Sequence, residues 1–591
     1  MKNEWCLDIK DGIYKIGDLN LMFHNDKIIE YPPIDVNNPK RPFYTGVIRQ
    51  EVSVDGENRP FLVYIPKSFP ISGAGVFLYP ENGVTCEEFL ENGGFKEIAD
   101  QKNVALIVLQ SRLGGWSRKD IQSEVTYSEQ VFKKAISRVY FSLNEAAYYI
   151  MGIGTGAYVA TTYGFLNSAV FSCILADGDY QLDARLLKQL GMICSDRDAS
   201  ESKLDVRMPA WMVDRTGNRA DDTILKTLKR ADTLKDAGLR NQYAAVYQQD
   251  MKRYYNSMDG LPMTEVWSTK AQEASEIPLD ILYEQMITFA LQFKRWMGIG
   301  NGDIRAARNY QDMNLKRYEA RIDDRMREWY VYQPSAYQQE PERKLPVVLA
   351  IHGYSCTGEI FAESSSWHEL AEKRDFFVIY VSAYPSNKYF GRGTVPLPTW
   401  NCIGMEAEAD DLHYISEVLK DVKSRYPVDM ERIYVTGHSN GSLMTQTLMA
   451  KMPLEFAAFA PQGAQFHVNP KNDPKADKRD IARDGILRPV WLMMGDEDVG
   501  VGSNLEPGLA NDKFIQMMCR VDHLDRNKVQ CLENGKYTTY TYTDEQKVPL
   551  LKFTGVKDFP HAYTPEICYL FWDQFFCHFR RKADGSVEYV E

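Results

Sequence analysis

Four segments of this chain recur in the same order in its second half, and this repeat constrains the fold more than any other feature. The passage FLVYIP near residue 61 parallels WYVYQP near residue 329, and GVFLYPENGVTCEEFL parallels VVLAIHGYSCTGEIF. Residues 149–161 parallel residues 434–446, and MPAWMVD parallels RPVWLMM. Five pairs of identical residues mark the correspondence: Tyr64/Tyr332, Pro66/Pro334, Thr85/Thr357, Phe89/Phe361 and Trp211/Trp491. Matched segments in one order and at similar spacing indicate two related halves. We place these halves at residues 1–300 and 301–591.

Each half alternates short apolar runs with longer amphipathic stretches. Runs rich in valine, isoleucine, leucine and tyrosine, such as PVVLAIHG, FFVIYVSA and RIYVTG, are separated by stretches such as 405–426 and 441–452. Near-continuous apolar strands separated by helices are typical of a parallel sheet that is buried on both faces. The sequence therefore predicts the α/β class, with two tandem domains that each hold a mostly parallel sheet flanked by helices. Functional residues are expected where strands end and loops begin.

Composition excludes several classes of protein. The 591 residues are 44% hydrophobic and 25% charged, as in an ordinary globular chain. The formal charge of −12 argues against general nucleic-acid binding and against docking on anionic membranes. No apolar run approaches the roughly 20 residues that cross a bilayer, and the first 20 residues hold no signal-peptide core. Ten cysteines without a CxxC pair favour reduced thiols, with pairing of Cys519 and Cys531 as the alternative. We expect a cytoplasmic protein.

One pentapeptide carries the strongest chemical signal. Residues 437–441 read Gly-His-Ser-Asn-Gly, after the strand-like run ERIYVT and before the helical stretch SLMTQTLMAKM. This is the G-x-S-x-G pattern in its strand–turn–helix context, where glycines permit a turn too tight for side chains and the serine hydroxyl is held up at the sheet edge. A chance match is less favoured because the flanking elements also fit. Ser439 is the candidate nucleophile.

A nucleophilic serine needs a base to accept its proton and an acid to orient that base. In this arrangement the chain order is serine, then aspartate or glutamate, then histidine. The run RPVWLMM leads into three carboxylates at 496–498, of which we choose Asp498 as the acid, with Asp496 as its competitor. His561 follows the run VPLLKFTG and precedes the final helical stretch, where the last strand would deliver the base. The other downstream histidines are interpreted as packing, loop or lid residues: His467, His523 and His578.

Acyl transfer also needs hydrogen-bond donors aimed at the developing oxyanion. One is expected from the backbone of Asn440, which follows the nucleophile. The other is expected from Tyr354 in the loop after the first buried strand, because Gly353 lets the backbone approach closely. The chain has no HExxH motif and no His/Cys cluster, so His352 is not expected to bind a metal. No metal or other cofactor is expected.

These segments together resemble a known family. The passages VVLAIHGYSCTGEIF, TWNC, RIYVTGHSNGSLMTQTLMAKMPLEFAAFAPQGA and GVKDFPHAYTPE resemble the polyhydroxybutyrate-depolymerase and feruloyl-esterase-like carboxylesterases, which have the α/β-hydrolase fold, over roughly 329–580. The resemblance implies a role for each of five residues: Ser439 as nucleophile, Asp498 as acid, His561 as base, and the amides of Tyr354 and Asn440 as oxyanion hole. It also makes Trp400 a candidate pocket wall, with a buried structural tryptophan as an equal alternative. Secreted members carry a signal peptide, so the start of this sequence favours small, soluble esters over an extracellular polymer.

The first half lacks the corresponding machinery. The serine position is Gly154, and the His-Gly of the oxyanion loop becomes Pro80-Glu81. The acid position falls on Asn218 and the histidine position falls near Ala274. No histidine lies between His24 and His352, so composition excludes a Ser-His-Asp site made from this half alone. We expect it to cover the catalytic half, to shape its pocket or to mediate oligomerisation.

The glycine cluster of the first half has a second interpretation. GIGTGA fits GxGxxA after an apolar strand, and Asp177 ends the next apolar run about 20 residues later, as in a dinucleotide fingerprint. This reading is less favoured because an apolar strand pair precedes the motif, and because its alignment with 434–463 already explains it as an elbow without a serine.

The sequence therefore predicts serine-dependent hydrolysis of a small soluble carboxylic ester, of feruloyl/cinnamoyl, acetyl or hydroxyalkanoate type, through an acyl-enzyme. An acyltransferase with the same triad, or a non-catalytic protein that binds a ligand or dinucleotide, is the alternative. The loop 382–401 is either a wall for an aromatic or sugar-linked acyl group or an ordinary surface loop. The charged insertion 466–487 is either a lid or a solvated loop. Homo-oligomerisation stays open.

Overall fold

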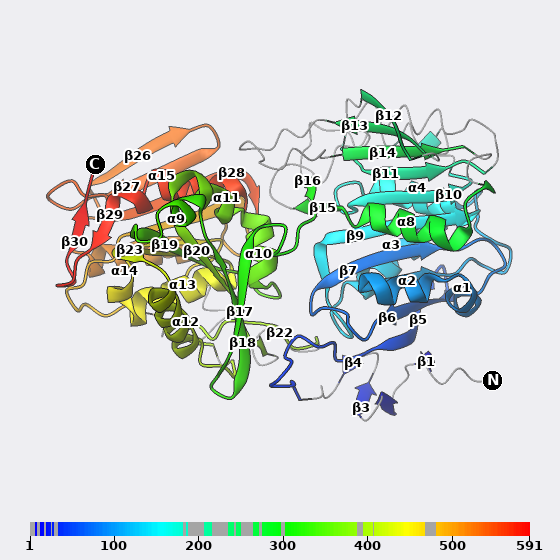
Figure 1. The fold of residues 1–591 in the computed structure, drawn as a ribbon, viewed down its shortest axis with the longest axis horizontal. Helices are drawn as coiled ribbons and strands as arrows, with labels where there is room; N and C mark the ends of the chain where they lie inside the picture. The colour runs from blue at the N-terminus through cyan, green and yellow to red at the C-terminus, as the bar shows by residue number, and fades with distance from the viewer. Residues whose placement is uncertain are drawn as a thin grey trace. The chain divides into compact units, whose positions relative to one another are not determined.

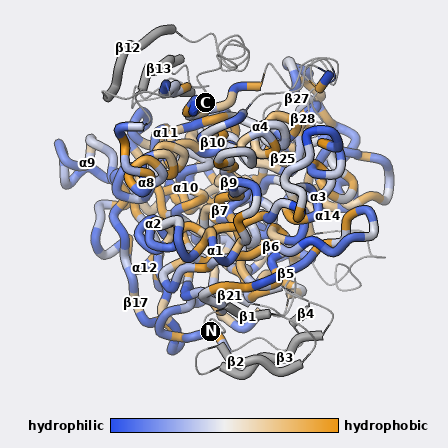
Figure 2. Tube along the Cα trace, turned by 90° about the vertical axis from the view of Figure 1, so that its right-hand side faces the viewer, coloured by the Kyte–Doolittle hydropathy of each residue, from blue (hydrophilic) through white to orange (hydrophobic). Residues whose placement is uncertain are grey.

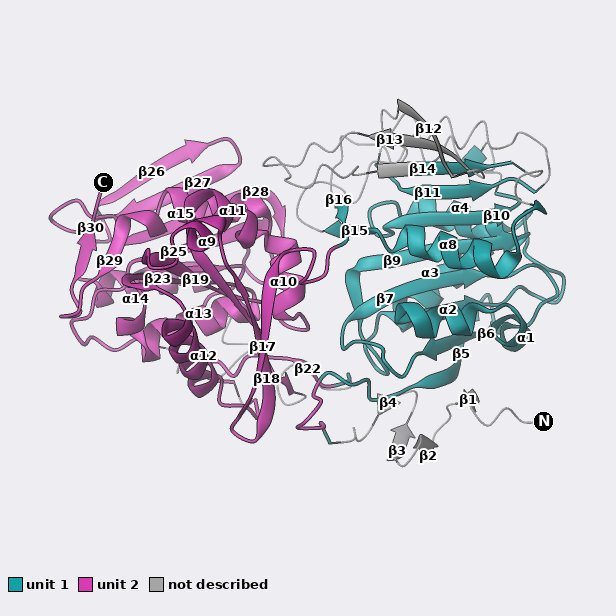
Figure 3. Ribbon diagram, viewed as in Figure 1, with its two compact units in different colours: residues 1–33, 40–307, 393–395 teal, residues 34–39, 308–392, 396–591 magenta. Residues whose placement is uncertain are grey.

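The computed structural model describes two compact units. Unit 1 comprises residues 1–33, 40–307 and 393–395, and unit 2 comprises residues 34–39, 308–392 and 396–591 (Figure 3). The described residues are 33–180, 185–186, 189, 206–215, 264–270, 275–296, 302–386, 394–405, 407–466 and 480–591, with the backbone of strands at 6–8, 12–16, 19–24, 27–28, 235–241 and 244–249. Asn218, Ala274, His467 and parts of the two loops discussed above (387–393 and 467–479) lie outside them.

Unit 2 is built on a ten-stranded sheet (Figure 1). Its strands follow one another in space in the order β17 (Leu315–Ile322), β18 (Arg325–Tyr332), β20 (Phe377–Val381), β19 (Leu345–Ile351), β23 (Val428–His438), β24 (Ala458–Gln462), β25 (Val490–Glu497), β28 (Leu551–Pro560), β27 (Tyr537–Tyr542) and β26 (Val529–Asn534). The six from β20 to β28 pair in parallel, and the two strands at each edge pair antiparallel. Five helices lie between the parallel strands in the chain, namely α10 (Gly358–Ser365), α11 (Trp367–Arg374), α12 (Asp411–Arg425), α13 (Asn440–Lys451) and α14 (Ala510–Val521). Helix α15 (Pro565–Asp573) follows the last of these strands, β28.

The parallel pairing explains both the composition of the strands and the place of the site. Every residue of β19, β20 and β24 is buried, because the sheet has no face left to water. The strands are also in register at their carboxyl ends, with Ile351 beside Gly437 and His438 beside Gln462. The loops that follow these strands therefore start at one edge of the sheet, which is where ligands bind in sheets of this kind.

Unit 1 has an eleven-stranded sheet. Its order is β1 (Cys6–Asp8), β5 (Gly46–Val54), β6 (Glu57–Ile65), β8 (Val104–Leu109), β7 (Gly73–Tyr79), β9 (Leu143–Gly154), β10 (Cys173–Gly178), β11 (Ala210–Val213), β14 (Thr264–Thr269), β13 (Ala244–Gln249) and β12 (Lys235–Asn241). From β5 onward this sheet has, strand for strand, the directions of the sheet in unit 2. Its helices include α1 (Cys86–Asn92), α2 (Phe95–Lys102), α3 (Ile121–Ala135), α4 (Gly156–Leu166) and α8 (Leu279–Ala290). The predicted α/β class, with two mostly parallel sheets flanked by helices, is confirmed.

A buried hydrogen bond between a tryptophan and a threonine lies at corresponding positions in the two units. The Trp211 indole N–H donates to Thr269 Oγ1 at 3.0 Å, and the Trp491 indole N–H donates to Thr554 Oγ1 at 2.8 Å. Both tryptophans are buried. Outer strands such as β17, by contrast, are largely hydrophilic (Figure 2). A tryptophan that is buried needs a partner for its N–H group, which explains why a threonine accompanies each.

Two sequence expectations concern properties outside the site. Among the described residues no helix is both long and apolar enough to span a bilayer. Cys519 is buried and Cys531 is exposed, and both are free thiols.

Candidate active site

The turn at Ser439 joins β23 to α13 with a strained backbone. Ser439 has φ 55° and ψ −117°, a conformation that non-glycine residues rarely adopt. A Cβ atom on Gly441 would lie 2.2 Å from the Ile351 carbonyl oxygen, and one on Gly437 would lie 2.3 Å from the Gly441 carbonyl oxygen. Both glycines are therefore required by close backbone contacts, as the G-x-S-x-G pattern predicts.

The side chains of Ser439, His561 and Asp498 form one hydrogen-bonded chain. His561 Nε2 lies 2.7 Å from Ser439 Oγ, and His561 Nδ1 is hydrogen-bonded to Asp498 Oδ1. The Asp498 side chain is 0% exposed, whereas the His561 side chain is 28% exposed. A serine, an imidazole and a buried carboxylate in this sequence can move a proton from the hydroxyl to the ring while the carboxylate orients the ring. The structure thus brings together the three residues that the sequence assigns to nucleophile, acid and base.

Asp496 is not part of the hydrogen-bonded series of Ser439, His561 and Asp498. Its carboxylate accepts the backbone N–H of Phe559 at 3.2 Å, and its side chain is exposed. Asp498 lies two residues further along and is the carboxylate that reaches His561. Of the other histidines considered as bases, His578 bonds through Nδ1 to the Val590 carbonyl at 2.7 Å, which ties it to its own chain terminus.

The two segments that carry the expected oxyanion donors lie beside the nucleophile. Asn440 is the first residue of α13, so its backbone N–H is one of the helix N-terminal donors that have no partner within the helix. A Cβ atom on Gly353 would lie 3.3 Å from Ser439 Cβ, which shows how closely the loop that carries Tyr354 approaches the serine. The positive end of the α13 dipole adds to the stabilisation of negative charge at this position.

Trp400 is hydrogen-bonded to the loop that carries Tyr354. Its indole N–H donates to the His352 carbonyl at 2.8 Å, and its backbone N–H donates to Asn440 Oδ1 at 2.7 Å. The side chain is fully buried, with its ring 6.5 Å from and nearly parallel to the Tyr414 ring. A pocket wall would need an exposed ring face. The geometry therefore supports the second of the two roles left open by the sequence, a buried structural tryptophan.

His352 is engaged through both ring nitrogens. Its Nε2 accepts the backbone N–H of Ala383 at 2.9 Å, and its Nδ1 lies 2.6 Å from the Gly353 carbonyl oxygen. Both contacts fit one neutral tautomer with the proton on Nδ1. Across the described residues, no group of three or more His, Cys, Asp or Glu side chains is arranged to hold a metal ion.

A buried ion pair that sequence reasoning missed is hydrogen-bonded to the residue that follows Trp400. Arg327 donates to Asp411 Oδ1 at 2.7 Å, and the backbone N–H of Asn401 donates to Asp411 Oδ2 at 2.7 Å. The Arg327 guanidinium lies 3.6 Å from the centre of the Tyr414 ring. Burial raises the pKa of Asp411, and Arg327 opposes that shift. The pair ties the segment that carries Trp400 to β18 and α12, and its only sequence signal is an aspartate at the start of an amphipathic stretch.

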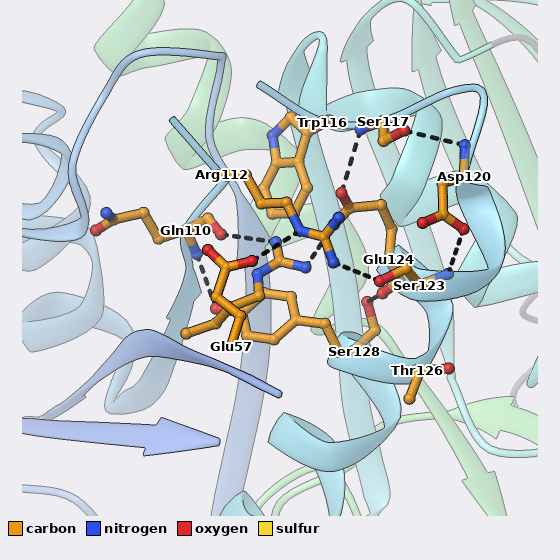
Figure 4. A network of polar contacts seen from close by, with 12 residues as sticks. Glu57, Gln110, Arg112, Trp116, Ser117, Asp120, Ser123, Glu124, Thr126 and Ser128 are labelled. Atoms are coloured by element: carbon orange, nitrogen blue, oxygen red, sulfur yellow. Dashed lines mark hydrogen bonds and ion pairs between the residues drawn. The ribbon is translucent and has the colours of Figure 1, made fainter. Parts of the chain in front are cut away.

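Unit 1 contains the same support without the reactive groups. Arg59 and Glu124 form a buried ion pair at 2.8 Å, and Arg59 lies 3.6 Å from the centre of the Tyr127 ring. Figure 4 shows the Glu124 carboxylate bonded to the backbone of Ser117, at 3.2 Å. The neighbouring Trp116 indole N–H donates to the Pro80 carbonyl at 2.7 Å, as Trp400 does to His352.

The position of the nucleophile in unit 1 is occupied differently. Gly154 has φ 55°, the same value as Ser439, and a Cβ atom there would lie 2.8 Å from the Glu81 side chain. Asp177 is buried, and Arg215 donates to both of its carboxylate oxygens, at 2.6 and 3.0 Å. A ribose hydroxyl would have to displace this arginine. The geometry of these residues therefore offers no support for a dinucleotide site at Gly154 and Asp177.

Comparison with known proteins matches unit 2. Residues 320–544 match the family model Esterase, described as "Putative esterase". Poly(3-hydroxyalkanoate) depolymerase C from Paucimonas lemoignei is 32% identical over 121 residues, which are 20% of this chain and 27% of that protein. Acetylxylan esterase A from Aspergillus ficuum is 30% identical over 136 residues, which are 22% of this chain and 39% of that protein. The chain thus spans well under half the length of these curated relatives.

Solved structures were also compared. An acetyl xylan esterase from Aspergillus awamori has a TM-score of 0.31 and 17% identity, and covers 42% of this chain and 94% of its own. A ferulic acid esterase has a TM-score of 0.30 and 14% identity, and covers 44% of this chain and 95% of its own. Residues 320–544 are thus similar to an esterase family, and these two curated relatives, which match part of this chain, are named as an esterase and a depolymerase.

Proposed function

We propose that this protein is a serine esterase that hydrolyses a small carboxylic ester through an acyl-enzyme in unit 2. The observation that carries the proposal is the hydrogen-bonded chain from Ser439 through His561 to the buried Asp498. His561 accepts the Ser439 proton as Oγ attacks the ester carbonyl, and the imidazolium that forms is stabilised by Asp498. The backbone N–H groups of Asn440 and Tyr354 are the donors proposed for the oxyanion.

The second half of the cycle uses the same residues. His561 donates its proton to the departing alcohol, which leaves the acyl group on Ser439 Oγ. A water molecule then attacks this ester while His561 accepts its proton, and collapse of the second intermediate returns the proton to Ser439 and releases the acid. An alcohol in place of water would make the protein an acyltransferase, and no observation favours that variant of the reaction.

The substrate class follows from the named activities of the relatives. Those relatives are named as esterases of acetylated xylan and as a depolymerase of hydroxyalkanoate polyesters. Both names describe esters whose acyl group, an acetyl or a hydroxyalkanoyl group, is aliphatic. We therefore propose short acyl esters as substrates, ahead of feruloyl esters, for which the sequence left room.

Pre-steady-state hydrolysis of p-nitrophenyl acetate tests this proposal. We expect a burst of nitrophenol followed by slower turnover, with both lost in Ser439→Ala and both retained in Ser364→Ala, a change on helix α10. Butyrate and methyl ferulate measured alongside would rank the acyl groups. A wild-type protein as inactive as Ser439→Ala on all three esters would contradict the proposal, and added alcohols would reveal acyl transfer as a new ester product.

Unit 1 is proposed to be a non-catalytic copy of unit 2. The matching order of strands and the matching tryptophan–threonine hydrogen bonds support common descent of the two units. The glycine at position 154, close to the Glu81 side chain, supports the absence of a nucleophile. The earlier expectations that this unit shapes the pocket or mediates oligomerisation, and that the protein is cytoplasmic, remain predictions.

A further inference from the structure

Two buried polar atoms beside the proposed triad have no hydrogen-bond partner within the described part of the chain. They are Asp498 Oδ2 and His438 Nε2. The other oxygen, Asp498 Oδ1, is hydrogen-bonded to His561 Nδ1 and accepts the backbone N–H of Val499 at 2.7 Å. A buried carboxylate oxygen without a hydrogen bond is destabilising, and native proteins rarely leave one so. These two atoms therefore need a common explanation.

Both atoms lie close to Gly463. A Cβ atom on Gly463 would lie 3.3 Å from His438 Nε2 and 3.4 Å from Asp498 Oδ2. Gly463 has φ 75°, and its backbone N–H donates to the Met493 carbonyl, so the residue follows β24 in a fixed conformation. A water molecule that contacts both atoms would therefore lie against the Cα atom of Gly463, on the side where any other residue would carry its Cβ atom.

The ring of His438 is held in place by two aromatic neighbours. Its centroid lies 4.7 Å from that of His561 and 6.0 Å from that of Tyr563, with the Tyr563 ring edge-on. Burial, and next the neighbouring His561, lower the pKa of His438 well below that of an ordinary histidine. A neutral imidazole carries one N–H donor and one acceptor nitrogen, so it can bind water without adding charge beside His561.

Unit 1 shows that this histidine is not required by the fold. The elbow there has the same strand–turn–helix form and the same positive φ, at Gly154, but its residue at the position of His438 is Ile153. Unit 1 also keeps the buried ion pair and the supporting tryptophan. The histidine is therefore absent from the unit that lacks a nucleophile, while the scaffold is present in both.

We infer that His438 is a positioning residue for Asp498, acting through one water molecule bound between His438 Nε2 and Asp498 Oδ2 beside Gly463. The water donates one hydrogen to Oδ2 and is oriented by the His438 ring. With both oxygens held, the carboxylate cannot rotate away from His561 when the imidazolium forms. The inference rests on the proposed function, because it gives Asp498 the role of the acid.

A double-mutant cycle tests the inference in the full-length protein. We expect His438→Ile, which places the residue of the unit 1 elbow, to lower kcat for p-nitrophenyl acetate about tenfold with KM unchanged, the size expected for one hydrogen bond to a charged group. His438→Gln retains a polar end of similar reach and should stay within about threefold of wild type. In an Asp498→Asn background, His438→Ile should change kcat less than about twofold, because residues that act as a unit are not additive. Equal losses in both backgrounds would overturn the inference.

Two further measurements do not depend on turnover. A crystal structure of the wild type should show a water within hydrogen-bond distance of both atoms, and density showing no water there would overturn the inference. The low-field proton resonance of the His561–Asp498 hydrogen bond should shift or broaden in His438→Ile and return toward wild type in His438→Gln; an unmoved resonance would count against it. If the wild type hydrolysed no ester, the proposed function would fail, while these two measurements would still decide whether His438 holds Asp498.

Discussion

At the scale of single residues, the surroundings of a carboxylate decide what it can do. Asp496 and Asp498 are two positions apart in one acidic turn. Asp498 is buried and reaches His561, whereas Asp496 is exposed and accepts a backbone N–H of the next strand. An exposed carboxylate is screened by water and cannot orient a ring that it does not touch.

This difference makes a quantitative prediction. Asp498→Asn should lower kcat for p-nitrophenyl acetate by about 10³- to 10⁴-fold, since the amide cannot stabilise the imidazolium or fix its tautomer. Asp496→Asn keeps the oxygen that accepts the Phe559 N–H and should stay within about threefold of wild type. Steady-state rates of the two purified variants provide the measurement. A larger loss in Asp496→Asn than in Asp498→Asn would reverse the assignment.

Sequence reasoning could reach Ser439, Asp498 and His561 because each follows a recognisable strand in a fixed chain order. It could not reach the Arg327–Asp411 pair, whose members are 84 residues apart and meet only when β18 and α12 pack together. It also could not reach the position of His438 over His561, since a histidine inside G-x-S-x-G gives no sign of what its ring contacts. For Trp400, only burial distinguishes a pocket wall from a structural support, and burial is a property of the folded chain.

At the scale of elements, buried charges join strands to helices. Asp411 links α12 to β18 through Arg327 and holds the backbone of Asn401 as well. On the same helix, Arg425 and Asp421 form a partly exposed pair at 2.7 Å, with 49% and 23% of their side chains exposed. One helix thus carries a buried and a partly exposed ion pair, whose strengths are directly comparable.

Removal of one partner should distinguish these pairs. We expect Arg327→Met to destabilise unit 2 by about 3–5 kcal/mol, because Asp411 is left buried without its counter-charge. Arg425→Met should change stability by less than about 1 kcal/mol, because water already screens that pair. The urea concentration at which esterase activity is half lost reports unit 2 alone. Similar midpoints for the two variants would show that burial does not control the pair's strength.

We expect Asp522, the residue that follows α14, to make the stability of this end of the helix depend on pH. It accepts the backbone N–H of Arg488 at 2.9 Å, and burial raises its pKa to about 7, against the opposing effect of Arg488. A raised acid pKa means that the folded state binds more protons than the unfolded state between about pH 4 and pH 7. The free energy of unfolding of the wild type should therefore fall, relative to that of Asp522→Asn, as the pH rises from about 4 to about 7. Parallel urea titrations at pH 5 and pH 8 test the sign, and a difference that grows toward pH 8 in favour of the wild type would contradict it.

At the scale of the whole molecule, the two sheets have the same topology, but only the elbow of unit 2 has a serine at the position proposed for the nucleophile. The internal repeat and the alternation of apolar runs were enough to predict this class of fold, because strand order in a parallel sheet is limited by its crossovers. The contents of each elbow are equally visible in the sequence, as a serine in one and a glycine in the other.

Labelling should therefore be limited to one site per chain. We expect a fluorophosphonate probe to add one group per chain to the wild type and none to Ser439→Ala, as measured by intact-protein mass spectrometry. Gly154→Ser should not add a second site, because no histidine lies between His24 and His352 to activate the new hydroxyl. Two labels on Gly154→Ser would contradict the proposal that unit 1 is non-catalytic.

The shared φ of 55° at Ser439 and Gly154 has a consequence for how activity and stability are balanced in this protein. A serine in that conformation carries a strain of about 1–3 kcal/mol, and a glycine does not. On the proposal that unit 1 is non-catalytic, Gly154 is the residue that suits the backbone, whereas Ser439 is the residue that suits the proposed reaction. Ser439→Gly should thus unfold at a higher urea concentration than Ser439→Ala, which keeps the strain and also lacks the hydroxyl. If it does, the nucleophile is a site where this chain gives up stability for chemistry, and the elbow of unit 1 shows what the same turn becomes when that demand is absent.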